Sequence, residues 1–178
     1  MIRYIAILRG INVGGHRKIL MADLKILVEK LGCSNVRTYI QSGNVVFDSS
    51  EKNLESKITQ AIKAAYNFDV PTIIRSAKEF EHAATSNPFL KDESIAIERL
   101  HLTFLSDFPT KEALEKFNEK DVSPDKLEVD GKEIFGCVVD RFSNSKLTNA
   151  LFEKTLKVSV TTRNWKTVCK LLEIAREN

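Results

Sequence analysis

The chain carries the same succession of apolar patterns twice, and this order limits the folds open to it. In residues 1–75 a nearly continuous apolar run is followed by a helix-period pattern, two short strand-like runs, a second helix-period pattern and a last strand-like run. Strands are predicted at residues 2–8, 36–40, 45–47 and 70–74, with helices on the apolar positions of 20–31 and 54–65. Strand, helix, strand, strand, helix, strand is the order of the ferredoxin-like unit.

The second half repeats this order without repeating the residues. Alternation at residues 100–105 predicts a half-buried strand with His101 at its solvent-facing or interfacial phase. Thr110 is the predicted cap of a helix, and Asp130-Gly131 predicts a type I′ hairpin. A helix capped by Ser143 or Ser145, a short strand and a last helix follow. The sequence therefore predicts an α+β fold made of a tandem duplication of ferredoxin-like (βαββαβ) units, with antiparallel sheets and a C-terminal helix.

The patterns also predict the domain organisation. A connecting helix is expected to end at Asn87-Pro88, and the polar stretch 91–98 is the best boundary. We expect a first ferredoxin-like unit at residues 1–75, a connecting helix and loop at 76–98, and a second unit plus the C-terminal helix at 99–178.

Composition narrows the class of protein. The chain has 178 residues, a net charge of +3 and 29% charged residues, typical of an ordinary globular protein rather than a dedicated nucleic-acid domain. Its three cysteines are far apart and form no CxxC, which favours a reducing compartment. No stretch approaches the roughly 20 apolar residues of a membrane helix, and no secretory pattern opens the chain. We expect a cytoplasmic protein without a membrane partner and, since no ligand spacing is present, without a metal site.

The most distinctive local feature is the loop after the first strand. It contains three glycines that permit positive φ and close backbone approach, an asparagine and three cations. These residues are Arg9, Gly10, Asn12, Gly14, Gly15, Arg17 and Lys18. The loop matches neither GxxxxGK[ST] nor GxGxxG, so it predicts a place for an anion without naming one. The alternative is a plain connection whose glycines serve turns.

Topology brings a second polar segment to this loop. In a ferredoxin-like unit the first strand ends where the hairpin between the second and third strands turns. Gln41, Ser42 and Asn44 in that turn are therefore expected beside the glycine loop, where with Asn12 they would set hydrogen-bonding specificity. The alternative is that Gly43 and Asn44 only serve hairpin geometry.

A third candidate segment opens the last helix. Thr161 or Thr162 is the predicted cap, and Arg163 and Asn164 follow it. A helix N-terminus with a nearby cation suits a phosphate or carboxylate, so Arg163 and Asn164 join the candidate anion-binding set. The alternative is that Arg163 is a surface or interface cation.

Three segments of the chain resemble a known family. They are Tyr4–Gly15 (YIAILRGINVGG), Val36–Phe47 (VRTYIQSGNVVF) and Thr161–Trp165 (TTRNW). Together they are similar to the bacterial family known as domain of unknown function sixteen-ninety-seven, across essentially the whole chain. The resemblance implies a cytosolic α+β protein of tandem ferredoxin-like units. It implies no established activity, so no catalytic residue is carried over.

Three functions are compatible with these residues. The first is a binding module for a phosphorylated or anionic small ligand, such as a nucleotide. The second is a small-molecule enzyme at the same place, with His16 as its acid or base. The third is a nucleic-acid-binding module that uses Tyr4 and Tyr39 on a sheet face, which the nearly balanced charge argues against. The sequence specifies no cofactor, reaction or oligomeric state.

Overall fold

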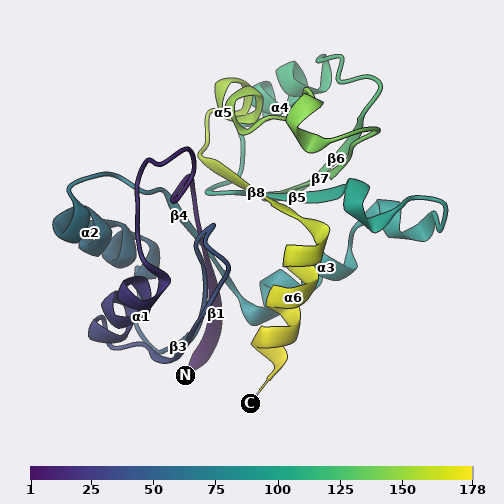
Figure 1. The fold of residues 1–178 in the computed structure, drawn as a ribbon. Coiled ribbons are helices and arrows are strands. Elements are labelled where there is room, and N and C mark those ends of the chain that lie inside the picture. The colour runs from purple at the N-terminus through teal and green to yellow at the C-terminus, as the bar shows by residue number, and fades with distance from the viewer. Residues whose placement is uncertain (178) are drawn as a thin grey trace. The chain divides into compact units, whose positions relative to one another are not determined.

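The computed structural model describes residues 1–177, and these residues form two four-stranded antiparallel sheets and six α-helices (Figure 1). This confirms the α+β class. The described chain divides into two compact units, of which the second is residues 83–169 and the first is the remainder. Asn178, the last residue of the expected second domain, lies outside the described residues.

The first sheet has the strand order β2-β3-β1-β4. Its strands are β1 (Ile2–Leu8), β2 (Ser34–Tyr39), β3 (Asn44–Ser49) and β4 (Thr72–Ser76). Helices α1 (Met21–Lys30) and α2 (Leu54–Tyr66) supply Leu24, Val28, Ile58 and Ile62 to a core shared with Phe47 of β3. All four strands and both helices lie within a few residues of their predicted positions.

Both faces of the central strand are buried, as its continuous apolar run predicts. Ala6 and Leu8 belong to the core beneath the helices, and Ile5 and Ile7 on the opposite face are equally buried. Removing each leucine or isoleucine side chain from water contributes about 1.5–3 kcal/mol. The first sheet therefore offers no open apolar face.

The second sheet has the order β6-β7-β5-β8, with every neighbouring pair antiparallel. Its strands are β5 (Leu100–Leu105), β6 (Lys126–Asp130), β7 (Glu133–Cys137) and β8 (Val160–Asn164), and its helices are α4 (Lys111–Asn118) and α5 (Asn149–Leu156). Thr110 caps α4 as predicted, because its Oγ1 accepts from the N–H of Ala113 at 3.2 Å. Three short 3₁₀ turns lie at Pro88–Lys91, Ile97–Arg99 and Phe142–Asn144.

The prediction of a half-buried β5 was wrong. All six residues of the strand are buried, and His101 stacks on the ring of Phe142 with 4.3 Å between ring centroids. Burial lowers the pKa of His101 from its ordinary value, although a backbone hydrogen bond to Arg99 acts in the other direction. Alternation along a strand shows which side chains share a face, but not whether that face is covered.

Two turn and cap predictions also need correction. The two-residue β6–β7 loop has positive φ at Gly131 but not at Lys132, which is the pattern of a type II′ turn rather than I′. Helix α5 begins at Asn149 with Thr148 as its cap, because Ser145 instead donates to Asp125 and accepts from the N–H of Leu147.

Helices α3 (Ala77–Thr85) and α6 (Trp165–Arg176) each contribute residues to both units. The last turns of α6 belong to the first unit. There Arg3 of β1 donates to the carbonyl oxygens of Ala175 and Glu177, while Arg3 and Asp48 form an ion pair at 2.8 Å. The first unit therefore combines residues from opposite ends of the sequence.

Candidate functional site

The glycine loop, residues 9–20 between β1 and α1, folds into a small hairpin of its own. The N–H of Asn12 donates to the carbonyl of Arg17 at 3.2 Å, and the N–H of His16 donates to the carbonyl of Val13 at 3.0 Å. Gly14 and Gly15 between them have φ of 59° and 79°, as both central positions of a type I′ turn require. These two glycines are therefore needed by the turn itself.

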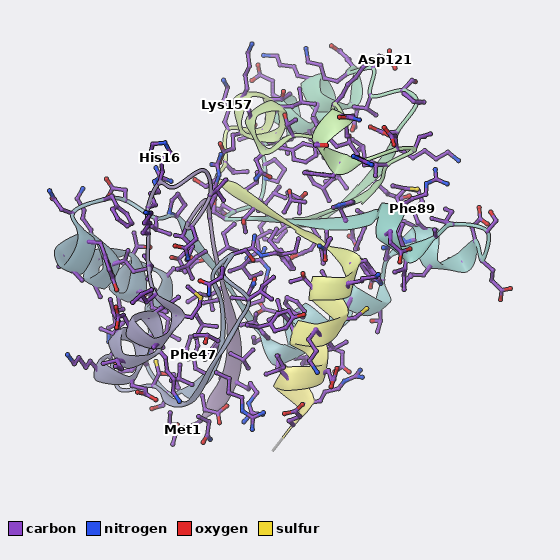
Figure 2. All side chains as sticks on the ribbon, viewed as in Figure 1. Met1, His16, Phe47, Phe89, Asp121 and Lys157 are labelled. Atoms are coloured by element: carbon purple, nitrogen blue, oxygen red, sulfur yellow. The ribbon has the colours of Figure 1, made fainter. Side chains whose placement is uncertain are left out.

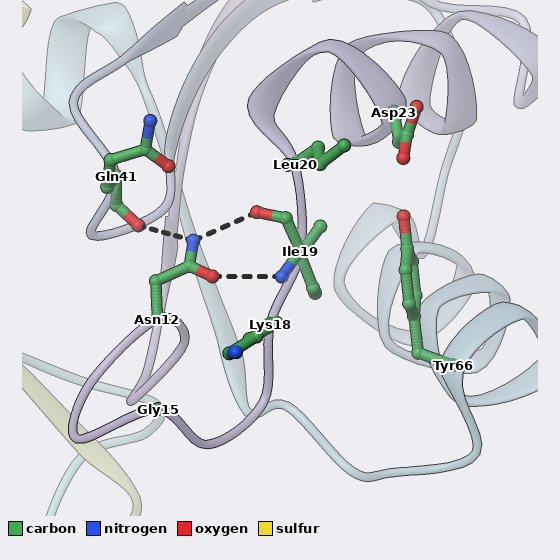
Figure 3. Close-up of a pocket in the computed structure, with 8 residues that line it drawn as sticks. All are labelled: Asn12, Gly15, Lys18, Ile19, Leu20, Asp23, Gln41 and Tyr66. Carbon is green, nitrogen blue, oxygen red and sulfur yellow. Dashed lines mark hydrogen bonds between the residues drawn. The ribbon is translucent and has the colours of Figure 1, made fainter.

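The side chain of Asn12 joins this loop to the β2–β3 turn. Its Nδ2 donates to the carbonyls of Ile19 at 2.9 Å and Gln41 at 2.8 Å, and its Oδ1 accepts from the N–H of Ile19 at 2.9 Å (Figure 3). The prediction that the two segments meet at one edge of the sheet is confirmed. Because both N–H groups of its amide are used, Asn12 holds the glycine loop against the β2–β3 turn.

The β2–β3 turn, residues 40–43, is packed closely against the start of the loop. The N–H of Leu8 donates to the carbonyl of Gly43 at 2.8 Å. A Cβ on Gly43 would lie 2.7 Å from Cδ1 of Ile11 and 2.8 Å from Cβ of Leu8. Asn44 is fully buried, and its Nδ2 donates to the carbonyl of Tyr39 and to Oγ of Ser42. Ser42 and Asn44 thus hold the turn in shape.

Backbone strain is concentrated in these two segments. Among the described residues, the non-glycine positions with positive φ that are neither asparagine nor a helix cap are Arg17, at 47°, and Ile40, at 50°. For a β-branched residue such as Ile40 this conformation is a genuine outlier. Strain of this kind persists where the surroundings enforce it and is common at binding sites.

A pocket of about 370 Å³ opens beside the glycine loop. Figure 3 shows Asn12 and Gln41 on one side of it and Asp23 and Tyr66 on the other, with the Tyr66 hydroxyl pointing toward the Asp23 carboxylate. The rest of its wall is Gly15, Lys18, Ile19 and Leu20. Burial and, after it, the charge of Asp23 raise the pKa of Tyr66. The pocket therefore has one side with two side-chain amides, a side that carries an aromatic ring and a carboxylate, and one cation, Lys18 (Figure 3).

The loop is strongly electropositive. It contains Arg9, Arg17 and Lys18 and no carboxylate. Burial lowers the pKa of Arg9, and the positive charge of Arg17 lowers it further. Nη1 of Arg17 lies 3.5 Å from the point where Gly10 would carry a Cβ. Among residues 1–177, neither Arg17 nor Lys18 has an ion-pair partner.

Comparison with known proteins identifies the family of this chain. The family described as "Protein of unknown function (DUF1697)" matches residues 1–135. The chain belongs to this family. The match confirms the resemblance read from the sequence, and it includes the whole glycine loop, the β2–β3 turn and the pocket.

A solved structure is similar over nearly the full length. It is the conserved bacterial protein SP0830 from Streptococcus pneumoniae, with 23% sequence identity, a TM-score of 0.67, and coverage of 98% of this chain and 99% of that one. At this identity the likeness shows the fold. A comparison with proteins of curated function gives no match.

The structure brings part of the predicted set together in the DUF1697 chain. Asn12, Gly15, Lys18 and Gln41 line the pocket. Arg9, Gly10, Gly14 and Arg17 lie in the same loop but outside the lining, and Ser42 and Asn44 form the adjacent turn. The other lining residues, Ile19, Leu20, Asp23 and Tyr66, were not predicted. Asp23 follows the loop closely in α1, whereas Tyr66 is brought there by the packing of α2 beside α1, which no local pattern signals.

Arg163 and Asn164 belong to the second unit and have structural contacts there. Arg163 is 8% exposed, its Nη1 donates to Oγ1 of Thr161 at 2.9 Å and to the carbonyl of Thr162 at 3.0 Å, and burial lowers its pKa to about 10. Oδ1 of Asn164 accepts from the N–H of Thr167 at 2.8 Å and caps α6. The predicted threonine cap was wrong, since β8 continues to Asn164.

His16 and Tyr4, which were nominated for the two alternative functions, do not line the pocket. His16 is exposed at the tip of the glycine loop (Figure 2) and does not line the pocket. Tyr4 packs on Phe47 in the first core, with 5.9 Å between ring centroids, rather than on an open sheet face. Within the described chain, no cluster of histidine, cysteine and carboxylate groups is arranged to hold a metal ion. None of the helices described combines the length and apolar character that crossing a bilayer requires.

Proposed function

We propose that the glycine-loop rim, residues 9–20 together with 40–44, binds a small anionic ligand, with a phosphorylated, nucleotide-like molecule as the leading class. The observation that carries this proposal is the gathering of Arg9, Arg17 and Lys18 on one loop without a carboxylate. Burial lowers the pKa of Arg9, and the nearby positive charge of Arg17 lowers it further. A bound anion would relieve this repulsion.

The pocket supplies a place for such an anion. Lys18 lines it, and Gly15 lets a ligand approach the backbone without meeting a side chain. Helix α1 begins beside it at Met21 without a side-chain cap, so its first N–H groups add positive potential. Asp23 and Tyr66 lie together on the side of the pocket opposite Asn12 and Gln41 (Figure 3). Because a carboxylate repels an anion, we expect the anion beside Lys18.

The direct test is a titration of the purified chain with inorganic phosphate, pyrophosphate and ATP. Lys18→Ala is expected to weaken binding about tenfold or more, because a hydrogen bond to a charged group is worth about 1.5–3 kcal/mol. Lys78→Ala, which removes an exposed lysine from α3, is the matched control and should leave the affinity unchanged. Absence of binding by all three anions, or equal losses in both variants, would contradict the proposal.

We also propose that the two units are copies of one ferredoxin-like unit, with residues 1–75 and 99–178 as the copies and 76–98 as their connection. The equivalent strand orders support this, since β1 lies between β3 and β4 as β5 lies between β7 and β8. An experimental structure in which the two sheets do not superpose strand for strand would contradict it.

We propose further that the chain works in the cytoplasm. Its cysteines Cys33, Cys137 and Cys169 are all free thiols, which suits a reducing compartment. Fractionation of cells that express the chain tests this, and recovery from an oxidising compartment would contradict it.

A further inference from the structure

A second hollow adjoins the pocket of the glycine-loop rim. It has a volume of about 680 Å³ and lies between α1 and α2, and we call it the α1–α2 groove. Asp23 and Tyr66 line both the pocket and the groove. The two hollows are therefore adjacent and share part of their walls.

The middle of the groove is apolar. From α1 it is lined by Ile26 and Leu27, and from α2 by Ala61, Ala64 and Ala65. Ile26 is 48% exposed, although removing a large apolar side chain from water lowers the free energy. The small alanine side chains leave the space beside it open. A hollow lined mainly by apolar side chains suits an apolar part of a ligand.

Charge is distributed unevenly around the two hollows. The pocket end carries Lys18 and lies beside the cationic glycine loop, whereas the middle of the groove has no charged residue until Lys30 at its far end. Between the two, the Asp23 carboxylate and the Tyr66 hydroxyl face one another (Figure 3). The arrangement presents a cationic end, a polar junction and an apolar channel, in that order.

We propose that the ligand of the rim is an anionic amphiphile, whose charged head lies beside Lys18 and whose linear apolar chain lies in the α1–α2 groove. This inference rests on the proposed anion-binding function. The shared wall at Asp23 and Tyr66 favours a thin chain, which can pass beside these two side chains, over a partner helix. A helix about 10 Å wide can lie along the groove but cannot continue into a pocket of about 370 Å³. A phosphorylated lipid and a fatty acid share this chemistry.

The test compares inorganic phosphate, butyl phosphate, octyl phosphate and octanol on the full chain, below the micellar concentration. A buried methylene group strengthens binding by up to about fourfold, so octyl phosphate should bind at least about tenfold more tightly than butyl phosphate. Octanol should bind weakly because it lacks the charge. Octanoate in a parallel titration distinguishes a carboxylate source from a phosphate source, and binding of either supports the proposal.

A variant in the groove separates the contribution of the ligand's apolar chain from that of its charged head. Ala65→Glu places a carboxylate among the apolar groups and should abolish the gain from butyl to octyl while leaving inorganic phosphate binding within about twofold. Ala150→Glu, at an exposed position of α5 in the second unit, is the matched control and should keep the gain. Methyl NMR signals of Ile26 and Ala65 should shift with octyl phosphate and not with inorganic phosphate.

The outcomes distinguish the amphiphile proposal from the anion-binding proposal on which it rests. Equal affinities for butyl and octyl phosphate, or an undiminished gain in Ala65→Glu, overturn the amphiphile and leave anion binding intact. Failure of every phosphate and of octanoate to bind overturns the proposed function and this inference together.

Discussion

Replacing Gly43 by alanine measures how tightly the glycine-loop rim is built. Gly43 has a φ of 82°, and a side chain in this region costs about 1–2 kcal/mol. The new Cβ would also lie 2.7 Å from Ile11 Cδ1 and 2.8 Å from Leu8 Cβ, and relieving such an overlap costs about 1–3 kcal/mol. We expect Gly43→Ala to lower the free energy of unfolding of the first unit by about 2–5 kcal/mol.

Gly32 provides a matched control at the end of α1. Its φ is 83°, but no atom lies within 4 Å of the point where its Cβ would be. Gly32→Ala should therefore cost only the backbone share, about 1–2 kcal/mol. The difference between the two variants isolates the overlap with Ile11 and Leu8.

The assay is urea unfolding followed by circular dichroism, with hydrogen exchange of the β1 and β3 amides to assign the loss to the first unit. Trp165 fluorescence cannot replace it, because Trp165 lies in the second unit. Equal losses in both variants would refute the close packing of the turn. If Ile11 yields, Gly43→Ala should also weaken phosphate binding, and Gly32→Ala should not.

Three further changes test the contacts described above. Asn12→Asp removes both donors to Ile19 and Gln41, so it should cost about 1–3 kcal/mol in urea unfolding. Asn164→Ala removes the cap of α6 and should cost about 0.5–2 kcal/mol, followed by Trp165 fluorescence. Burial lowers the folded-state pKa of His101 below its ordinary 6.5, so the unfolded state binds its proton first. Stability should fall as the pH drops below 6.5, and this dependence should disappear in His101→Gln.

Each of these outcomes has a clear contradiction. An Asn12→Asp variant as stable as the parent would mean that water can replace the hydrogen bonds that Asn12 donates. If Asn164→Ala is as stable as the parent, a group other than Asn164 caps α6. A stability that rises below pH 6.5 would show that the imidazole gains, rather than loses, favourable contacts on protonation.

Features governed by local rules were predictable from the sequence. The uninterrupted apolar run of β1 indicated a strand covered on both faces, and Gly32 indicated the end of α1, where its φ is positive. Thr110 indicated the start of α4. The meeting of the glycine loop with the β2–β3 turn followed from strand order, because that order fixes which loops share an edge.

Features that depend on packing were not predictable in the same way. His101 was predicted to face solvent or an interface, because alternation gives its phase but not the covering ring of Phe142. Arg163 was chosen for its charge, although it is buried on its own strand. The pocket includes Tyr66 from the end of α2, and no local pattern relates that residue to the glycine loop.

The composition of the first unit has a consequence for how the protein is made. Part of that unit, including the carbonyls of Ala175 and Glu177 that accept from Arg3, is encoded after the whole of residues 83–169. At about 5–20 residues per second, a ribosome needs several seconds to synthesise residues 83–169 before it reaches this part of the first unit. Throughout that interval the nascent first unit lacks these partners, so its last stabilising contacts form after, and not before, the second unit has left the ribosome.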